Sequence, residues 1–327
     1  MVLSNAPTVS IVLCTYNGAK YLREQLDSLI AQTYPIAEII AQDDGSTDQT
    51  LDILQEYAEK YPILKIYHHT DHSAGLNSNF FSAMRKTSGD LIAISDQDDI
   101  WELDKIERQV EAIGDALLCT CRSKPFSTDG LPVQYDDRTP NYHLVRLLFA
   151  SIPGHTMLLR RELLAKVPPI PDDCFGTAYD VVLASTAASF APISLVDSVL
   201  VHQRRTTSAA TYTHPDGTTR ASASNGLHQL LWSVRNYRRT MAKAREQKLR
   251  PRLRLFEGIR SETDDYRDAL RISRLRAEGG FVNLLRLSAM CIKHRNHLFY
   301  ARTSGAANLL RAALYPLMQA YNFRHLL

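Results

Sequence analysis

The sequence predicts an α/β fold built on a parallel sheet, followed by a helical extension. Three observations support this prediction. In the first hundred residues, short β-rich runs alternate with amphipathic helical patterns, as in the βαβ units of parallel sheets. From residue 227 onward the pattern is helical. The charge divides at the same place: residues 1–226 hold 18 Lys and Arg against 28 Asp and Glu, whereas residues 227–327 hold 20 against 7. Such an asymmetry indicates a catalytic or binding body with a basic attachment region.

Four strands are expected in the N-terminal part. They are "TVSIVLCT" (8–15), "AEIIAQ" (37–42), "ILKIYHH" (63–69) and "DLIAISD" (90–96), with helical patterns at about 19–32, 48–61 and 75–87 between them. Open α/β sheets bind their ligands beyond the carboxyl ends of the strands. The loops that follow these strands are therefore the first places to look for chemistry.

After about residue 113 the pattern loosens. The segment "AYDVVLASTAASF" (178–190) predicts an amphipathic helix, and "ISLVDSVLVHQRR" (193–205) predicts a strand. A polar stretch rich in Gly, Ser and Thr comes next and is typical of a linker. We therefore expect a catalytic domain at 1–215, divided into halves at 1–113 and 114–215, a linker at 216–226 and a basic helical extension at 227–327.

The composition excludes several classes of protein. Five cysteines, none in a metal-ligand spacing such as C-x-x-C, predict reduced thiols. No apolar run approaches the length of a membrane span, and the N-terminal segment lacks the features of a signal peptide. No recognisable nucleic-acid module is present, so nucleic acid is not an expected partner. We expect a cytoplasmic protein.

The stretch "ISDQDDIW" (94–101) places three aspartates directly after a predicted buried strand. Asp96 and Asp98 lie two positions apart in extended chain, so their side chains project to the same side and could face one Mg²⁺ or Mn²⁺ ion. An EF-hand loop does not fit, because Trp101 stands where that loop needs Gly. A structural role remains as an alternative, and we expect Asp99 to cap the helix that follows.

The loops after two earlier strands are also polar. Tyr16 and Asn17 follow the first strand, and Asp43 and Asp44 end the second. A parallel topology brings these loops to the same sheet edge as the acidic stretch. Carboxylates gathered at one edge repel one another unless a cation or a donor-bearing ligand lies among them. A ligand site at this edge therefore explains why all three loops are polar, whereas separate structural roles would have to be assumed for each loop.

These motifs resemble family 2 glycosyltransferases, inverting enzymes of GT-A fold that use nucleotide-diphospho-sugars. The resemblance is carried by "VSIVLCTYNGAKYLREQLDSLIAQTYPIAEIIAQDDGSTDQT" and "GDLIAISDQDDIW", strong over residues 8–110 and weaker to about 210. The "SDQDDIW" form with "CTYNG" is similar to the rhamnosyltransferase-type branch of bacterial surface-polysaccharide synthesis. The resemblance implies that 1–113 is the nucleotide-binding half and 114–215 the acceptor-side half.

The resemblance also implies roles for individual residues of the nucleotide pocket. Thr15, Tyr16 and Asn17 match the loop that lines it. Asp44 matches the carboxylate that accepts from the pyrimidine N3–H, with Asp43 as its neighbour. Asn79 matches a polar position in the same pocket, with a position on the helix surface as the alternative.

The acidic stretch is implied to hold a metal. Asp98 matches the direct ligand, and Asp96 the residue that contacts the ribose or the shell of the metal. The implied cofactor is Mn²⁺ or Mg²⁺, which stabilises charge on the leaving nucleoside diphosphate.

An inverting reaction needs a base that deprotonates the acceptor hydroxyl. In this branch the base is the Asp of an "HDWW"-like segment, and "YDVV" (179–182) stands in that place. It departs from the family before the Asp and at both aromatic positions. Asp180 is the expected base, with Asp172 or Asp173 as rivals and a helix N-cap as the structural alternative.

Two further segments offer candidate site residues. "SIPGHTMLLRREL" resembles the acceptor-side segment "GCTMLFNREL", so residues 154–156 are expected to floor the sugar or acceptor pocket, although a lone histidine such as His155 is more often structural. Where the family usually has "YRQH", this chain has "HQRR". Either His202 ligates the metal after a register shift, or Arg204 or Arg205 pairs with the diphosphate.

The expected function is transfer of a sugar from dTDP-rhamnose or a UDP-hexose to a lipid-linked saccharide, at the inner face of the bacterial cytoplasmic membrane. Basic and apolar residues alternate at helical spacing in 227–327, which suits amphipathic helices on anionic lipid. A bundle packed on the catalytic domain or on another subunit is the alternative. Because "YDVV" and "HQRR" depart from the family, a catalytically silent binding or scaffold protein of the same fold is the competing hypothesis.

Overall fold

The computed structural model describes residues 6–68, 75–170, 178–206, 223–299 and 305–327. The chain divides into two compact units. Unit 1 consists of Met1–Asp137, Ser151–Val167 and Ala178–Tyr212, and unit 2 of Arg138–Ala150, Pro168–Thr177 and Thr213–Leu327. Two short segments of the expected catalytic domain thus group with the C-terminal helices. Most of the expected linker lies outside the described residues.

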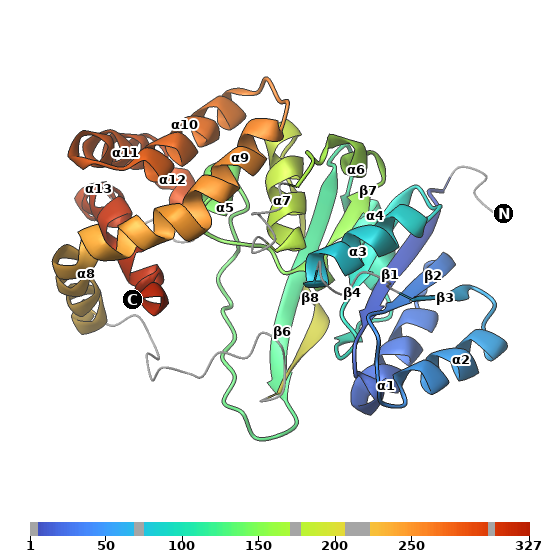
Figure 1. The fold of residues 1–327 in the computed structure, drawn as a ribbon. Helices are drawn as coiled ribbons and strands as arrows, with labels where there is room; N and C mark the ends of the chain where they lie inside the picture. Colours follow the sequence, from blue (N-terminus) through green and yellow to red (C-terminus); the bar gives the residue numbers. More distant parts are fainter. Residues whose placement is uncertain (1–5, 69–74, 171–177, 207–222, 300–304) are drawn as a thin grey trace. The chain divides into compact units, whose positions relative to one another are not determined.

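Unit 1 contains one mixed sheet (Figure 1). Its described strands, in order across the sheet, are β3 (Leu64–His68), β2 (Ile36–Asp43), β1 (Val9–Thr15), β4 (Leu91–Ser95), β7 (Leu158–Arg160), β6 (Leu118–Ser127), β8 (Ser194–Arg205) and β5 (Ile100–Trp101). The four strands predicted from the N-terminal part, β1 to β4, are parallel to one another. Every residue of β1 and β4 is buried, as in parallel strands covered on both faces.

Helices cover both faces of this sheet. α1 (Ala19–Ile30), α2 (Thr50–Lys60) and α4 (Lys105–Ala112) share a hydrophobic core with alternate strand residues such as Ile11 and Ala41. α3 (Gly75–Lys86) lies on the opposite face, because Gln42, the residue after Ala41, hydrogen-bonds to Asn79 of that helix. α7 (Tyr179–Phe190) contacts α3 and also α6 (Glu162–Lys166).

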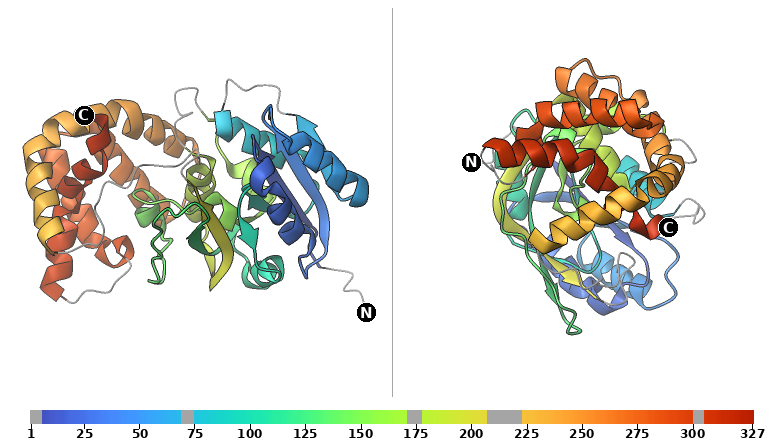
Figure 2. Two further views of the ribbon diagram at one scale, coloured as in Figure 1. Left: turned by 90° about the horizontal axis from the view of Figure 1, so that it is seen from below. Right: turned by 90° about the vertical axis from the view of Figure 1, so that its left-hand side faces the viewer.

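Unit 2 is helical in its described residues. Its helices are α5 (Leu144–Leu147), α8 (Ala223–Ala244), α9 (Arg250–Gly258), α10 (Asp264–Glu278), α11 (Phe281–Lys293), α12 (Arg295–Leu298) and α13 (Gly305–Asn322). The part of the chain drawn in orange to red in Figure 2 forms helices, as the sequence predicts. None of the described helices combines the length and the apolar character needed to cross a bilayer. The four described cysteines of the chain are buried and free of disulfide bonds.

Candidate functional site

The carboxyl ends of β1, β2 and β4 meet at one edge of the sheet in unit 1. Thr15, the last residue of β1, pairs with Asp43 of β2, and Leu13 pairs with Ser95 at the end of β4. The loops that carry the predicted site residues therefore start side by side. This arrangement follows from the strand order, as the sequence predicts.

Asp43 is the buried anchor of the first two loops. Its Oδ1 accepts hydrogen bonds from Thr15 Oγ1 at 2.8 Å and Ser46 Oγ at 2.5 Å, and its Oδ2 accepts from the backbone N–H groups of Gly45 and Ser46 at 3.0 and 2.8 Å. The Asp43 and Thr15 side chains are buried, so both hold the loops from inside the fold rather than from its surface. Asp44, the next carboxylate, is partly exposed.

Asn17 ties the first loop to the second. Its backbone has a φ of 46°, in the left-handed region that Asn tolerates better than most residues. Its N–H donates to Ser46 Oγ at 2.8 Å, and its Oδ1 accepts from the Thr47 N–H at 2.8 Å. The neighbouring Tyr16 is 57% exposed, so the fixed backbone presents an aromatic ring at this edge.

Gln97, the middle residue of the Asp-x-Asp motif, joins the first loop to the acidic loop. The Tyr16 N–H donates to Gln97 Oε1 at 2.8 Å, and Gln97 Nε2 donates to the Tyr16 carbonyl at 2.9 Å. A Cβ atom at Gly18 would lie 2.2 Å from Gln97 Oε1, so a larger residue there would displace the Gln97 amide from these bonds. The sequence analysis assigned Gln97 no role. The sequence feature that could have indicated this role is an amide side chain, which can donate and accept hydrogen bonds at the same time, between two carboxylates.

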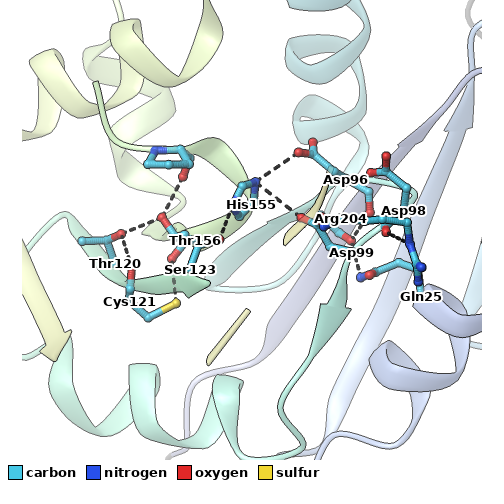
Figure 3. Close-up of polar contacts among 12 residues, drawn as sticks. Gln25, Asp96, Asp98, Asp99, Thr120, Cys121, Ser123, His155, Thr156 and Arg204 are labelled. Carbon is cyan, nitrogen blue, oxygen red and sulfur yellow. Dashed lines mark hydrogen bonds and ion pairs between the residues drawn. The ribbon is translucent and has the colours of Figure 1, made fainter. Parts of the chain in front are cut away.

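A buried histidine lies among the carboxylates of the acidic loop (Figure 3). His155 is 2% exposed, and its Nδ1 lies 3.2 Å from Asp96 Oδ2 and 3.4 Å from Asp99 Oδ2. Its Nε2 lies 3.0 Å from Ser123 Oγ of β6. One ligand atom from each of Asp96, Asp99 and His155 falls within 4.8 Å of the others. These three residues, Asp96, Asp99 and His155, form the acid–histidine cluster, which is the candidate metal site. The carboxylate of Asp98, the expected direct ligand, is not part of this group.

The electrostatics of the acid–histidine cluster fit a cation. Burial, and then the charge of Asp96, raise the pKa of Asp98 to about 6. Burial also raises the pKa of Asp99 to about 7, with Asp96 and Asp98 adding to it against the opposing effect of His155. Although burial lowers it, the pKa of His155 is raised by the Asp99 and Asp96 carboxylates. Asp99 Oδ2 is buried and accepts no hydrogen bond from the described residues. An oxygen-rich, crowded donor set of this kind suits Mg²⁺ or Mn²⁺.

The prediction that Asp99 caps the next helix is wrong. Asp99 is 1% exposed, and its Oδ1 accepts from the Arg204 N–H at 3.0 Å. The residue before α4 is Asp104, which makes no side-chain capping bond. Asp99 turns inward because β5 pairs with β8 directly after it, and this pairing brings Arg204 against the acidic loop.

The "HQRR" segment lies in β8, and its side chains make contacts in different places. His202 Nε2 lies 2.6 Å from Glu102 Oε1, and its side chain is 37% exposed. The acid–histidine cluster instead contains His155, which the sequence analysis placed in the pocket floor. The structure therefore gives no support to His202 as a metal ligand.

Arg204 holds the acidic loop from inside unit 1. Its Nε donates to the Asp98 carbonyl at 2.9 Å, its Nη2 donates to Glu24 Oε2 at 2.8 Å, and its side chain is 2% exposed. The guanidinium carbon lies 4.3 Å from the ring centroid of Tyr21 and 4.7 Å from that of Phe126. Arg204 is thus committed to protein contacts, which leaves Arg205 as the arginine of this segment for a diphosphate.

Asn79 lies in a buried network below the edge. It is 1% exposed, and its Oδ1 accepts from Gln42 Nε2 at 2.8 Å. Lys86 Nζ donates to the other end of the same amide, Gln42 Oε1, at 2.6 Å. This burial counts against Asn79 as a residue that faces a ligand, and its position supports β2 from α3.

Tyr179, at the start of α7, is a buried residue packed against Gly154, which precedes His155 in the chain. It is 6% exposed, its ring stacks on Phe80 at 4.0 Å, and its N–H donates to Asn77 Oδ1 at 2.7 Å. A Cβ atom at Gly154 would lie 2.0 Å from the Tyr179 hydroxyl oxygen. The glycine of the "PGHT" segment is therefore needed for this packing.

Asp180 is partly exposed in the first turn of α7. Burial raises the pKa of Tyr179 well above its ordinary value, and the charges of Asp96 and Asp180 raise it further. The Tyr179 phenol is thus within electrostatic range of both carboxylates. The rivals Asp172 and Asp173 lie outside the described residues.

Comparison with known proteins supports this resemblance. Residues 10–167 match the family described as glycosyl transferase family 2. This part of the chain is similar to a family 2 glycosyltransferase domain. The match contains the three strand-end loops and the acid–histidine cluster.

Curated relatives agree with this assignment. TuaG of Bacillus subtilis, whose name places it in teichuronic acid biosynthesis, is 35% identical over 136 residues, 41% of this chain and 50% of the relative. The dTDP-rhamnosyl transferase RfbG of Shigella flexneri is 37% identical over 177 residues, 52% of this chain and 61% of the relative. The chain thus spans about half the length of the curated relatives it matches.

Solved structures confirm the predicted GT-A fold. Residues 1–349 of S. aureus TarS, in complex with UDP-GlcNAc, are similar with a TM-score of 0.55 at 17% identity, over 96% of this chain and 89% of that chain. The mannosyltransferase PcManGT from Pyrobaculum calidifontis, in complex with GDP-Man and Mn²⁺, is similar with a TM-score of 0.53 at 19% identity, over 97% and 85%. At these identities the likeness shows the fold alone.

Proposed function

We propose that this protein is an inverting, divalent-metal-dependent glycosyltransferase that moves a sugar from a nucleotide-diphospho-sugar to an acceptor hydroxyl. The observation that carries the proposal is the meeting of three loops at one sheet edge, inside the part of the chain that is similar to a family 2 glycosyltransferase domain. That edge combines the exposed ring of Tyr16, the carboxylate of Asp44 and the acid–histidine cluster. These are the groups needed to bind a base, a ribose and a diphosphate.

The nucleotide is held by the first two loops. The Tyr16 ring flanks the base, and Asp44 accepts from the N3–H of uracil or thymine, a donor that purine edges present differently. Thr15, Asn17 and Asp43 position these two side chains through their contacts within the loops. The crystal structure of TarS with UDP-GlcNAc and the name of RfbG are consistent with a pyrimidine nucleotide.

The acid–histidine cluster is the place for Mn²⁺ or Mg²⁺. Asp96, Asp99 and His155 place their ligand atoms close together and would hold it. Asp98 of the same loop would join them as a further ligand by turning its carboxylate towards the ion. When bound, such an ion stabilises the negative charge on the departing nucleoside diphosphate. Gln97 and Arg204 keep the acidic loop in place through the Tyr16 backbone and the Asp98 carbonyl. Arg205 is the remaining candidate to pair with the diphosphate.

Asp180 serves as the base. Its carboxylate takes the proton of the acceptor hydroxyl while the acceptor oxygen attacks the anomeric carbon from the face opposite the diphosphate. The new C–O bond forms as the bond to the diphosphate breaks, and the nucleoside diphosphate leaves with the electron pair. The configuration at the anomeric carbon is therefore inverted.

The proposed substrates follow the relatives and the charge distribution. The donor is dTDP-rhamnose or a UDP-hexose, and the acceptor is a lipid-linked saccharide of cell-surface polysaccharide synthesis at the inner face of the cytoplasmic membrane. The name of RfbG, a dTDP-rhamnosyl transferase, supports the donor, and the name of TuaG, a glycosyltransferase of teichuronic acid biosynthesis, supports the biosynthetic role. The excess of Lys and Arg in residues 227–327 supports a protein that works beside anionic lipid.

The experiment that tests the proposed function is a donor panel. The purified full chain is incubated with Mn²⁺ or Mg²⁺, membrane extract as acceptor source, and a panel of UDP- and dTDP-sugars, and release of UDP or dTDP is measured. We expect release with one donor class only, and its loss on chelation of the metal. The departures at "YDVV" and "HQRR" favour one competitor, a catalytically silent binding protein, and no release with any donor would establish it.

A further inference from the structure

The exposed apolar side chains of unit 2 are concentrated on three helices. On α8, Leu227, Leu231 and Val234 are 59 to 61% exposed, and on α11, Phe281, Val282 and Leu285 are 55 to 74% exposed. α13 adds two leucines, at positions 309 and 310. Among the described residues of α9 and α10, no large apolar side chain is exposed to this degree. Isolated exposed leucines are common on soluble proteins, but a group of exposed apolar side chains on three helices indicates a surface that binds a partner.

The same three helices carry no acidic residue. All seven Asp and Glu residues of 227–327 lie between Glu246 and Glu278, after α8 and before α11. α8 contributes three arginines and a lysine, and α11 an arginine and a lysine. The helices that carry the exposed apolar side chains, α8, α11 and α13, therefore carry Lys or Arg but no Asp or Glu.

Each set forms a continuous face of its helix. On α8, Leu227, Leu231 and Val234 are spaced i, i+4 and i+7, and the exposed Arg235 and Arg238 continue the same face towards the C-terminal end. On α11 the apolar first turn is likewise followed by an exposed arginine, Arg286. Each face thus presents an apolar part directly beside a basic part.

The three helices are neighbours in unit 2. α13 contacts both α8 and α11, and Figure 1 shows it between them. The rings of Trp232 on α8 and Tyr321 on α13 lie 5.4 Å apart, and Ser288 of α11 donates to the Ala313 carbonyl of α13 at 2.8 Å. α8, α11 and α13 therefore pack next to one another, with α13 in contact with both of the others.

We propose that α8, α11 and α13 form a lipid-docking surface for a bilayer rich in anionic headgroups. Leu and Phe side chains enter the headgroup boundary while neighbouring arginines pair with lipid phosphates. A second copy of the chain fits less well, because pairing of these helices would bring arginines against arginines. The proposal rests on the proposed function for its purpose, since a lipid-linked acceptor would be met at such a surface.

Vesicle co-sedimentation of the full chain tests this surface. Vesicles of phosphatidylcholine alone are compared with vesicles containing about a third phosphatidylglycerol. We expect binding only to the anionic vesicles, weakening as salt is raised. The double variant Arg235→Gln/Arg238→Gln removes two charges from the α8 face and should weaken binding on the order of 10- to 30-fold. The matched control Arg267→Gln/Arg271→Gln makes the same charge change on α10 and should bind as the unaltered chain does.

Further measurements distinguish a lipid-docking surface from a contact with a second copy of the chain. Equal binding to neutral and anionic vesicles, or an equal loss in the α10 control, would overturn it. Leu231→Ser/Val234→Ser should also reduce vesicle binding with an unchanged circular dichroism spectrum. If that variant instead dissociates an oligomer in sedimentation velocity and binds vesicles normally, the surface covers a second copy. Metal-dependent UDP or dTDP binding is also measured on every variant. A variant that loses vesicle binding but keeps nucleotide binding shows that this surface is separate from the nucleotide site.

Discussion

At the residue scale, the candidate site depends on side chains that hold backbone in place below those that would meet a ligand. Asp43 fixes the second loop, Asn17 ties the first loop to the second, and Gln97 ties the first to the acidic loop. The bonds of Asn17 and Gln97 join segments that are adjacent only in the folded chain, whereas those that Asp43 makes with the second loop lie within one turn. A site preorganised in this way keeps its charged groups close without a rearrangement on binding.

Replacing the predicted base should separate binding from turnover. In Asp180→Asn the carboxylate is lost with little change of shape, so turnover should fall by about 10²- to 10⁴-fold, whereas donor affinity stays near that of the unaltered chain. Calorimetry with the donor and release of nucleoside diphosphate measure the two effects. Asp115→Asn, at an exposed position, is the matched control. Turnover near the normal rate in Asp180→Asn would exclude Asp180 as the base.

Arg204 should act on the metal site without touching the ligand. In Arg204→Gln the Asp98 carbonyl and Glu24 lose their guanidinium partner, so the affinity for Mn²⁺ should fall about 10- to 100-fold, as for other residues that orient metal ligands. Arg205→Gln, one position along, should leave Mn²⁺ binding unchanged in the absence of nucleotide. Binding of Mn²⁺ can be followed by electron paramagnetic resonance. An unchanged affinity in Arg204→Gln would refute this positioning role.

Several site residues could be predicted from the sequence, and several could not. Asp96, Asp98, Asp43 and Asp44 stand at strand ends in a recognisable order, so their meeting at one edge follows from topology alone. The roles of His155 and Arg204 depend on β6, β7 and β8, whose contacts with the acidic loop are made across long stretches of chain. Their partners could not be read from local spacing, and the sequence left open whether His202 binds the metal or Arg204 or Arg205 binds the diphosphate.

At the scale of the elements, the N-terminal strands were predictable and β6 was not. β1 to β4 are apolar runs bounded by polar loops. β6 lies in a segment that the sequence analysis treated only as loosely patterned, and it contains a proline, Pro125. It is a strand because it pairs with β7 on one side and β8 on the other, and such long-range pairing leaves little local signal.

A buried carboxylate in the central sheet makes stability depend on pH. Glu38 of β2 accepts from Ser10 Oγ at 2.9 Å, Ser88 Oγ at 2.7 Å and Lys65 Nζ at 2.7 Å. Although burial raises it, hydrogen bonds from Lys65, Ser88 and Ser10 lower the pKa of Glu38 from 4.5 to about 2. A carboxyl whose pKa is lower in the folded state stabilises the fold above about pH 4.5, and this contribution is lost as the pH falls towards 2.

The variant Glu38→Gln tests this linkage. At pH 7 we expect its free energy of unfolding to be lower by about 1–3 kcal/mol, because a charged acceptor of several hydrogen bonds is replaced. The deficit should shrink as the pH is lowered from 4.5. Urea unfolding at a series of pH values measures it, with the exposed Glu111→Gln as control. A deficit independent of pH would show that shape rather than charge matters at this position.

At the scale of the whole molecule, the charge asymmetry of the sequence corresponds to a division between an α/β unit with an acidic ligand edge and a helical unit with a basic surface. The division is not a simple cut, since Arg138–Ala150 and Pro168–Thr177 group with the C-terminal helices. These segments are short, and their membership is decided by tertiary contacts, so composition along the chain could not reveal it. The functional consequence is a chain whose proposed donor site and proposed lipid surface can be altered separately.

The central claim is that the acidic edge of unit 1 binds a pyrimidine nucleotide together with a divalent metal. The most direct test is calorimetric titration of UDP and dTDP into the full chain with and without Mn²⁺, with GDP as the purine control. The account predicts that UDP or dTDP binds only when Mn²⁺ is present, that GDP binds more weakly, and that Asp98→Ala abolishes the binding. Equal binding without metal, or undiminished binding by Asp98→Ala, would contradict it.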